Sequence, residues 1–71
     1  MKVKELIEQL QKLDQELEVL VPGYEAHYDT AVIGKVIEFE PNVHEEWYYG
    51  SHDERKGGSA KGIVLERPNK A

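Results

Sequence analysis

Apolar residues in the first part of the chain recur with the spacing of one helix face. They are separated by three or four residues, which places them on a single stripe of an α-helix. The stripe consists of Val3, Leu6, Ile7, Leu10 and Leu13. Most residues between them are Glu, Gln or Lys, and Glu5 in the first turn suits the helix dipole. The pattern predicts an amphipathic helix over residues 3–13.

Four later segments have the composition of β-strands, with branched or aromatic residues bounded by turn residues. These predicted strands are residues 17–21, 31–39, 43–49 and 61–66. Residues 22–29 and 50–60 read as polar loops, and the second is the more flexible because it is rich in glycine and charge.

The predicted strand 31–39 changes its pattern at Gly34. Both of its faces are apolar before this glycine, whereas afterwards one face turns acidic. A β-bulge or bend near Gly34 would place Val32 and Ile37 on the same face.

These elements predict an α+β fold in which one N-terminal helix packs on a three- to four-stranded, mostly antiparallel sheet, in the order αββββ. The chain of 71 residues has room for one domain, which we assign to residues 1–67, with a tail at 68–71. The helix stripe is expected to cover one face of the sheet. The opposite face would then keep Val32, Val36, Tyr48 and Val64.

Composition narrows the function classes. Apolar residues make up 39% and charged residues 32% of the chain, which is a globular balance. The absence of cysteine excludes disulfides, thiolate metal sites and cysteine nucleophiles. We see neither a signal peptide nor an apolar run that could span a bilayer, and therefore expect a cytoplasmic protein with no membrane partner.

The net charge of −5 is unevenly distributed. Residues 1–34 and 35–54 are both acidic, whereas residues 55–71 carry five bases against Glu66 alone. Most of the domain should repel phosphate groups, and the bases are too sparse to form a patch, so we expect no nucleic-acid partner.

Two polar segments hold candidate chemistry. The first combines His27 with Glu25 and Asp29, and the second combines His44 and His52 with several acids. Neither has the spacing of a known metal signature, and the run that begins at His44 is not the HExxH motif. We therefore favour surface loops and assign no metal and no cofactor.

Nucleophilic catalysis has little support in the sequence. Ser51, His52 and Asp53 are adjacent, but neighbours in an extended chain point apart and cannot act as a triad. No strand–turn–helix motif surrounds a serine. We assign no catalytic residue and expect a protein that is not an enzyme.

Trp47, Tyr48 and Tyr49 are consecutive. A strand would point them to both faces, so at least one is expected in the core and at least one at the surface. Exposed tryptophan and tyrosine are common anchors of binding surfaces.

The opening Val3-Lys4-Glu5-Leu6-Ile7-Glu8-Gln9-Leu10, continued by Val19-Leu20-Val21, resembles a loose group of small bacterial and prophage-type proteins. The Gly23-Tyr24-Glu25 and Trp47-Tyr48-Tyr49-Gly50 segments are similar to members of that group. The group has no assigned activity. The resemblance implies a bacterial or phage accessory protein rather than a metabolic enzyme.

The first functional hypothesis is a non-catalytic binding module that engages a host protein, or a second copy, through an acidic and aromatic surface. Its candidate binding residues are Tyr24, Tyr28, His44, Glu46, Trp47, Tyr48, His52 and Arg55.

Two alternatives belong to other classes. In a small-molecule or nucleotide binder, tyrosines would stack on a base and the basic side chains would meet phosphates. The residues concerned are Tyr24, Tyr28, Tyr48, Arg55, Lys56 and Lys61. A metal-binding protein would use His27, His44 and His52.

A homodimer is also expected. So small a domain has a marginal core, and pairing sheet faces or edges across a two-fold axis would bury the apolar side chains left over. The acids Glu38, Glu40 and Glu46 oppose this association if they meet near the axis.

Overall fold

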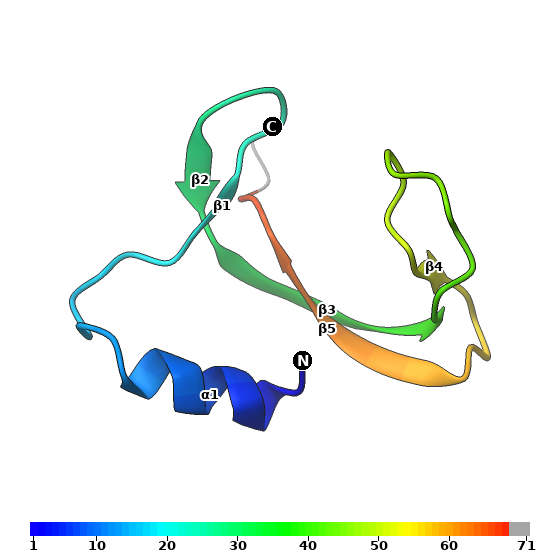
Figure 1. Cartoon of the computed structure of the whole chain (residues 1–71), viewed down its shortest axis with the longest axis horizontal. Helices are drawn as coiled ribbons and strands as arrows, with labels where there is room; N and C mark the ends of the chain where they lie inside the picture. Colours follow the sequence, from blue (N-terminus) through cyan, green and yellow to red (C-terminus); the bar gives the residue numbers. More distant parts are fainter. Residues whose placement is uncertain (69–71) are drawn as a thin grey trace.

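The chain forms one helix followed by five strands (Figure 1). The computed structural model describes residues 1–68, so the predicted tail lies outside the described residues except for Pro68. The helix is α1 (Val3–Gln11), and the strands are β1 (Leu20–Pro22), β2 (Tyr28–Thr30), β3 (Val32–Glu40), β4 (Asp53–Glu54) and β5 (Ala60–Glu66). The α+β class is confirmed, with the antiparallel strands divided between a two-stranded sheet and a three-stranded sheet.

Both ends of α1 are closed by nearby side chains. The backbone N–H of Lys2 donates to Glu5 Oε1 at 3.3 Å. At the other end, Gln15 Nε2 donates to the carbonyl oxygens of Leu10 at 3.0 Å and Leu13 at 2.8 Å. Because this side chain satisfies carbonyl groups that a longer helix would bond internally, α1 ends at Gln11, two residues before the predicted end.

Strands β1 and β2 form a short hairpin that was only half predicted. β1 lies later than the expected strand 17–21, since Leu17 belongs to a turn in which its N–H donates to the carbonyl of Asp14 at 3.2 Å. β2 falls in the segment predicted to be a loop. The connection is closed by the Gly23 N–H, which donates to the His27 carbonyl at 2.9 Å, with His27 in the left-handed region at φ 64°.

The long antiparallel pair β3–β5 forms the centre of the three-stranded sheet, whose order is β4-β3-β5. Its register pairs Ile33 with Leu65 and Val36 with Ile63, and it shifts between Ile33 and Val36. The bulge predicted near Gly34 is confirmed.

The bulge sorts the apolar side chains of β3 and β5 onto two faces. Since Leu65 and Ile63 are two residues apart, both point to one side of the sheet, and their partners on β3 point with them. We call this exposed set the hairpin face: Ile33, Val36, Ile63 and Leu65. The other side holds Val32, Ile37 and Val64, which are half-buried. The prediction that Val32, Val36 and Val64 share one exposed face is therefore wrong for Val36, which the bulge moves to the opposite side.

The predicted third strand, residues 43–49, is absent from the fold. The chain turns back there, with the Tyr49 N–H donating to the carbonyl of Glu46 at 3.1 Å, and returns to the sheet only at β4. Trp47, Tyr48 and Tyr49 are all exposed, so the expectation that one of them enters the core is wrong. A turn among consecutive residues leaves their side chains outside the sheet.

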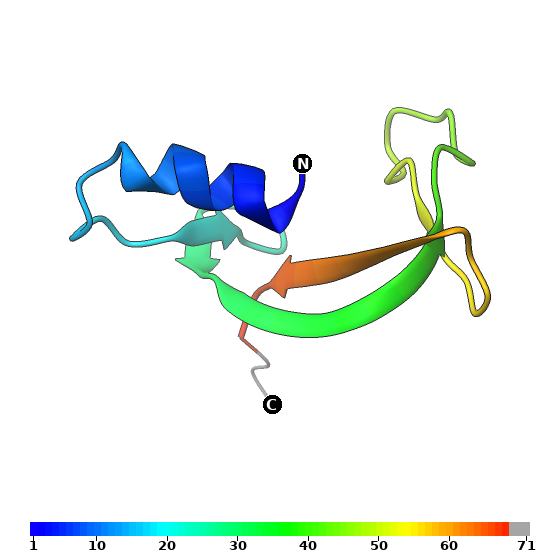
Figure 2. The ribbon, with the colours of Figure 1, turned by 90° about the horizontal axis from the view of Figure 1, so that it is seen from below.

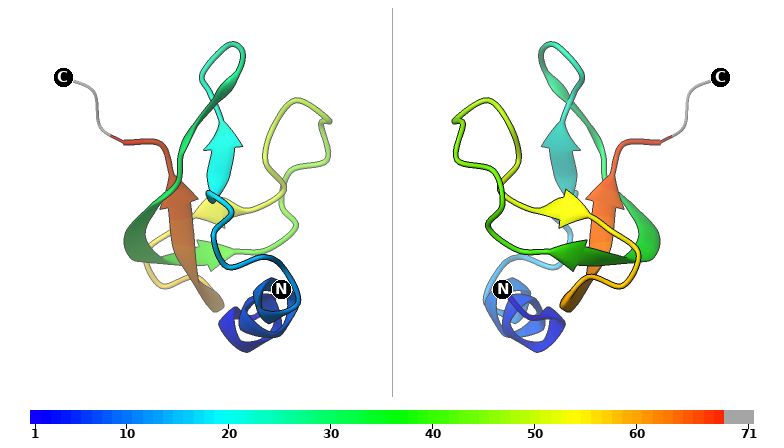
Figure 3. Two further views of the ribbon diagram at one scale, coloured as in Figure 1. Left: turned by 90° about the vertical axis from the view of Figure 1, so that its left-hand side faces the viewer. Right: turned by 90° about the vertical axis from the view of Figure 1, so that its right-hand side faces the viewer.

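The described residues build no closed core. None of residues 1–68 is buried, and the apolar stripe of α1 is largely exposed. The Cα radius of gyration is 14.2 Å, whereas a compact domain of this length has about 11 Å. Figures 2 and 3 show the reason: α1 lies beside the curved β3–β5 ribbon and does not cover it. No helix in residues 1–68 has the length and hydrophobicity needed to cross a bilayer.

The close packing of Gly58 against the backbone of β3 can be tested by substitution. A Cβ added there would lie 2.5 Å from the backbone carbon and oxygen of Phe39, whereas one added at Gly50 would meet nothing within 4 Å. We expect Gly58→Ala to lower the free energy of unfolding by about 1–3 kcal/mol, the usual cost of overpacking. Gly50→Ala should leave it nearly unchanged. Chemical denaturation of both variants checks this, and equal stabilities would contradict the close approach.

Candidate interaction loop

Residues 41–52 form a loop that backbone hydrogen bonds close at its base; we call it the aromatic loop. The N–H groups of Val43 and His44 both donate to the carbonyl oxygen of Ser51, at 2.9 and 3.1 Å. The Asn42 N–H donates to Nδ1 of His52 at 3.1 Å. Asn42 adopts φ 58°, a left-handed conformation that asparagine tolerates better than most residues. The loop is therefore pinned where it leaves and re-enters the sheet.

Side chains reinforce this base. The ring of His52 lies against that of Phe39, with centroids 5.1 Å apart. Asp53, at the start of β4, has one carboxylate oxygen 3.7 Å from His44 Nε2 and the other 3.0 Å from an Arg55 guanidinium nitrogen. The carboxylate thus links the outgoing and returning arms of the loop.

A row of aromatic rings runs from the base of the loop to its tip. His44 and Tyr49 meet edge to face at 5.6 Å, Tyr49 and Tyr48 at 4.9 Å, and Tyr48 and Trp47 at 5.5 Å. Edge-to-face pairs at these distances are favourable. Trp47 ends the row with 92% of its surface exposed. The rings support one another, and the last presents its indole to solvent.

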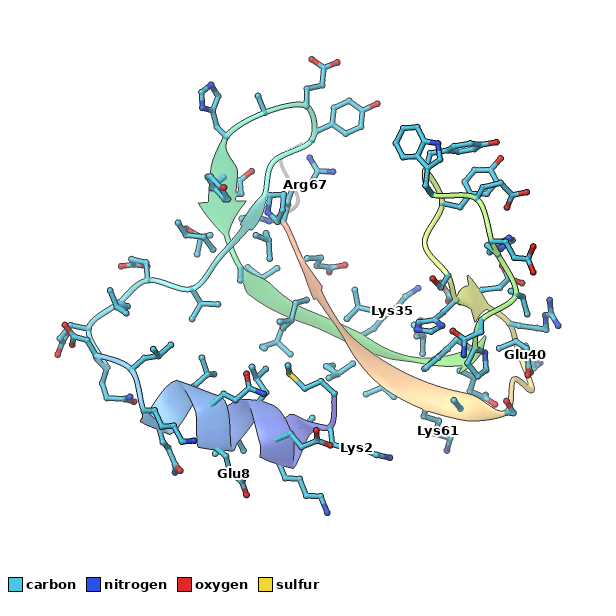
Figure 4. The ribbon with its side chains drawn as sticks, viewed as in Figure 1. Lys2, Glu8, Lys35, Glu40, Lys61 and Arg67 are labelled. Carbon is cyan, nitrogen blue, oxygen red and sulfur yellow. The ribbon has the colours of Figure 1, made fainter. Side chains whose placement is uncertain are left out.

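The loop is acidic as well as aromatic. Glu45 and Glu46 are exposed immediately before Trp47. At the end of β3, Glu40 accepts hydrogen bonds from the backbone and hydroxyl of Ser59 at 3.2 and 3.0 Å (Figure 4). Two exposed carboxylates therefore adjoin the tryptophan in the chain, whereas Glu40 holds the β4–β5 connection.

The structure gathers most of the predicted binding residues and separates two of them. On the aromatic loop or at its base lie His44, Glu46, Trp47, Tyr48, His52 and Arg55. Tyr24 and Tyr28 belong to the β1–β2 hairpin, at the opposite end of β3 (Figure 1). There the guanidinium of Arg67 lies 5.4 Å from the centre of the Tyr24 ring (Figure 4).

The groups needed for the nucleotide alternative are dispersed. Arg55 is paired with Asp53. Lys56 and Lys61 line an open hollow of about 430 Å³ along the β3–β5 ribbon, together with Lys35 and two glutamates and without an aromatic side chain. The tyrosines lie on the aromatic loop and on the β1–β2 hairpin, so no single surface joins them to the lysines.

The histidines are also divided. His44 and His52 line one open hollow of about 370 Å³ with Tyr49 and Gly50, whereas His27 lies in the β1–β2 hairpin. Within residues 1–68, no three His, Asp or Glu side chains are grouped closely enough to hold a metal ion.

Comparisons with family models, curated proteins and solved structures find no match to this chain.

Sequence reasoning overlooked the residues that shape the loop. Asn42, Ser51 and Phe39 hold its base, and Tyr49 joins the ring row, yet none of them belongs to the predicted binding set. The Pro41-Asn42 pair is a turn signal that ends the predicted strand 31–39, but the strand-like composition of residues 43–49 concealed the loop that opens there. No comparable signal in the sequence indicates the contact between the rings of Phe39 and His52, which are far apart in the chain.

We expect His52→Ala to loosen the aromatic loop without unfolding the sheet. It removes both the acceptor for the Asn42 N–H and the ring against Phe39. Loss of one such bond corresponds to about tenfold faster amide exchange, which should be confined to residues 42–52. His27→Asn is the control, because asparagine suits the left-handed conformation in the distant hairpin. If the amides of residues 42–52 exchange at the same rate in both variants, His52 does not hold the loop.

Proposed function

We propose that the chain is a non-catalytic protein-interaction module whose aromatic loop engages a basic surface on a partner protein. The observation that carries this proposal is the exposed indole of Trp47, presented at the end of a row of edge-to-face rings on a pinned loop. The earlier resemblance to prophage-type proteins makes a bacterial host protein in the cytoplasm the partner class to test first.

A pre-organised aromatic side chain is well suited to anchoring a protein complex. Tryptophan and tyrosine dominate the binding energy of many interfaces, since they bury a large area at a small loss of rotamer freedom. The Trp47 indole already contacts Tyr48, which in turn contacts Tyr49. Binding would therefore immobilise few additional rotatable bonds, which lowers the entropic cost of association.

The neighbouring charges favour a basic partner. Glu45 and Glu46 directly precede Trp47 in the chain, whereas Arg55, near the loop base, is paired with Asp53. Carboxylates around an apolar anchor attract cationic surfaces and orient the encounter.

The roles of the two loop histidines support binding rather than catalysis. His44 lies beside Asp53 and Tyr49, and His52 accepts the Asn42 N–H while its ring meets Phe39. Ser51 contributes its carbonyl oxygen to the loop base. Each of these groups thus has a part in shaping the loop.

Trp47→Ala tests the anchor directly. The full chain and its variants would be immobilised, partners captured from a bacterial lysate, and affinities measured with the purified partner. We expect Trp47→Ala to weaken binding at least about thirtyfold, as for a strong interface anchor, and Tyr48→Ala to weaken it less. Tyr24→Ala is the matched control, because Tyr24 is an exposed tyrosine on the distant β1–β2 hairpin. Equal affinities for folded Trp47→Ala and Tyr24→Ala would refute the proposal.

Glu46→Gln tests the electrostatic part. Removing one carboxylate beside the anchor should slow association a few-fold at low salt, because steering by exposed charges depends on ionic strength. The difference from the unmodified chain should shrink at about 0.5 M salt, where screening is strong. Stopped-flow association rates at both salt concentrations measure this. Glu8→Gln on α1 is the control for net charge alone.

A further inference from the structure

The hairpin face is continuous with the exposed apolar side of α1. An open cleft of about 410 Å³ lies between them, lined by Met1, Lys2, Val3, Leu6, Ile33, Ile63 and Leu65. Further along the helix, Leu10 and Leu13 line a second hollow with Leu17 and Val19. The helix stripe and the hairpin face therefore border one extended apolar surface that the chain does not cover.

The chain exposes more surface than a compact monomer of its mass. A folded monomer of this mass exposes about 4,500 Å², whereas this chain exposes 6660 Å². The excess is about 2,200 Å² per chain, or about 4,400 Å² for two chains. Obligate homodimers bury about 2,000–5,000 Å² through interfaces that resemble a divided core. The excess, part of which belongs to the exposed aromatic loop, is thus of the size that a dimer interface buries.

Charges around this surface permit two copies to meet. On the same side of the sheet as the hairpin face, Glu38 on β3 is the cross-strand partner of Lys61 on β5. Lys2 and Glu5 lie at the helix end of the cleft. Since both signs occur at each end, a symmetric pairing does not bring a surface of one sign against itself. Of the acids expected to oppose association, Glu40 is engaged by Ser59 and Glu46 lies on the aromatic loop.

We propose that the occupant of this surface is a second copy of the chain: two copies pack the helix stripe and hairpin face together across a two-fold axis and form a shared core. The aromatic loops lie outside this interface, at the far end of each β3 (Figure 1). The inference is therefore independent of the proposed partner binding, and Trp47→Ala should dimerise like the unmodified chain.

Sedimentation velocity and thermal unfolding of the full chain test the dimer. We expect twice the chain mass of 8.2 kDa at micromolar concentrations. The midpoint of unfolding should rise by about 4–5 °C for each tenfold increase in concentration, as mass action requires of a folded dimer. A monomer throughout, or a midpoint independent of concentration, would overturn the proposal.

A matched pair of variants locates the interface. Ile33 and Tyr28 are 73% and 71% exposed in the single chain. If the protein were a monomer, truncating either side chain should therefore change the free energy of unfolding by a similar amount. A dimer through the hairpin face instead predicts that Ile33→Ala raises the dissociation constant at least tenfold and Tyr28→Ala less than threefold. Ile33→Glu should give a monomer or an unfolded chain, whereas Tyr28→Glu should remain dimeric. Equal dissociation constants for the two alanine variants would overturn the proposed face.

Discussion

Backbone pairing between β3 and β5 is the interaction on which the remaining structure depends. Side-chain burial is incomplete everywhere in residues 1–68, so the hydrogen-bonded ladder, rather than a packed core, holds the centre of the structure together. The β1–β2 hairpin leads into one end of β3, and β4 with the aromatic loop follows the other end. The bulge between Ile33 and Val36 then decides which apolar side chains face α1 and which face away.

The elements that were predictable are those whose hydrophobic pattern matches their period. The helix stripe, β3 with its bulge, and β5 all have enough apolar residues for this signal. β2 and β4 show no such pattern, because Tyr28–Thr30 and Asp53–Glu54 are too short for a periodicity to appear, and backbone pairing places them beside β1 and β3. For residues 43–49 the pattern predicted a strand that the fold lacks. Their aromatic content is typical of strands, but their rings meet edge to face around a turn.

The candidate site was partly predictable because most of its residues are neighbours in the sequence. Residues 44–55 are contiguous, so their gathering into one loop needed little knowledge of the fold. Tyr24 and Tyr28 were grouped with them on chemistry, and only the position of the β1–β2 hairpin separates them. Charge runs and aromatic composition identify the type of surface, whereas the path of the chain decides which residues share it.

The strand order has a consequence for solubility. β5 is an outer strand of its sheet, and its Ile63-Val64-Leu65 segment has the composition of an aggregation-prone strand. An outer strand of this kind is a template on which another extended chain can add, in the manner of a growing fibril. Lys61 and Glu66 flank the apolar segment and act as gatekeepers, since stacking identical strands would align like charges. The charges at the two ends of this apolar segment therefore disfavour the stacking of identical β5 strands.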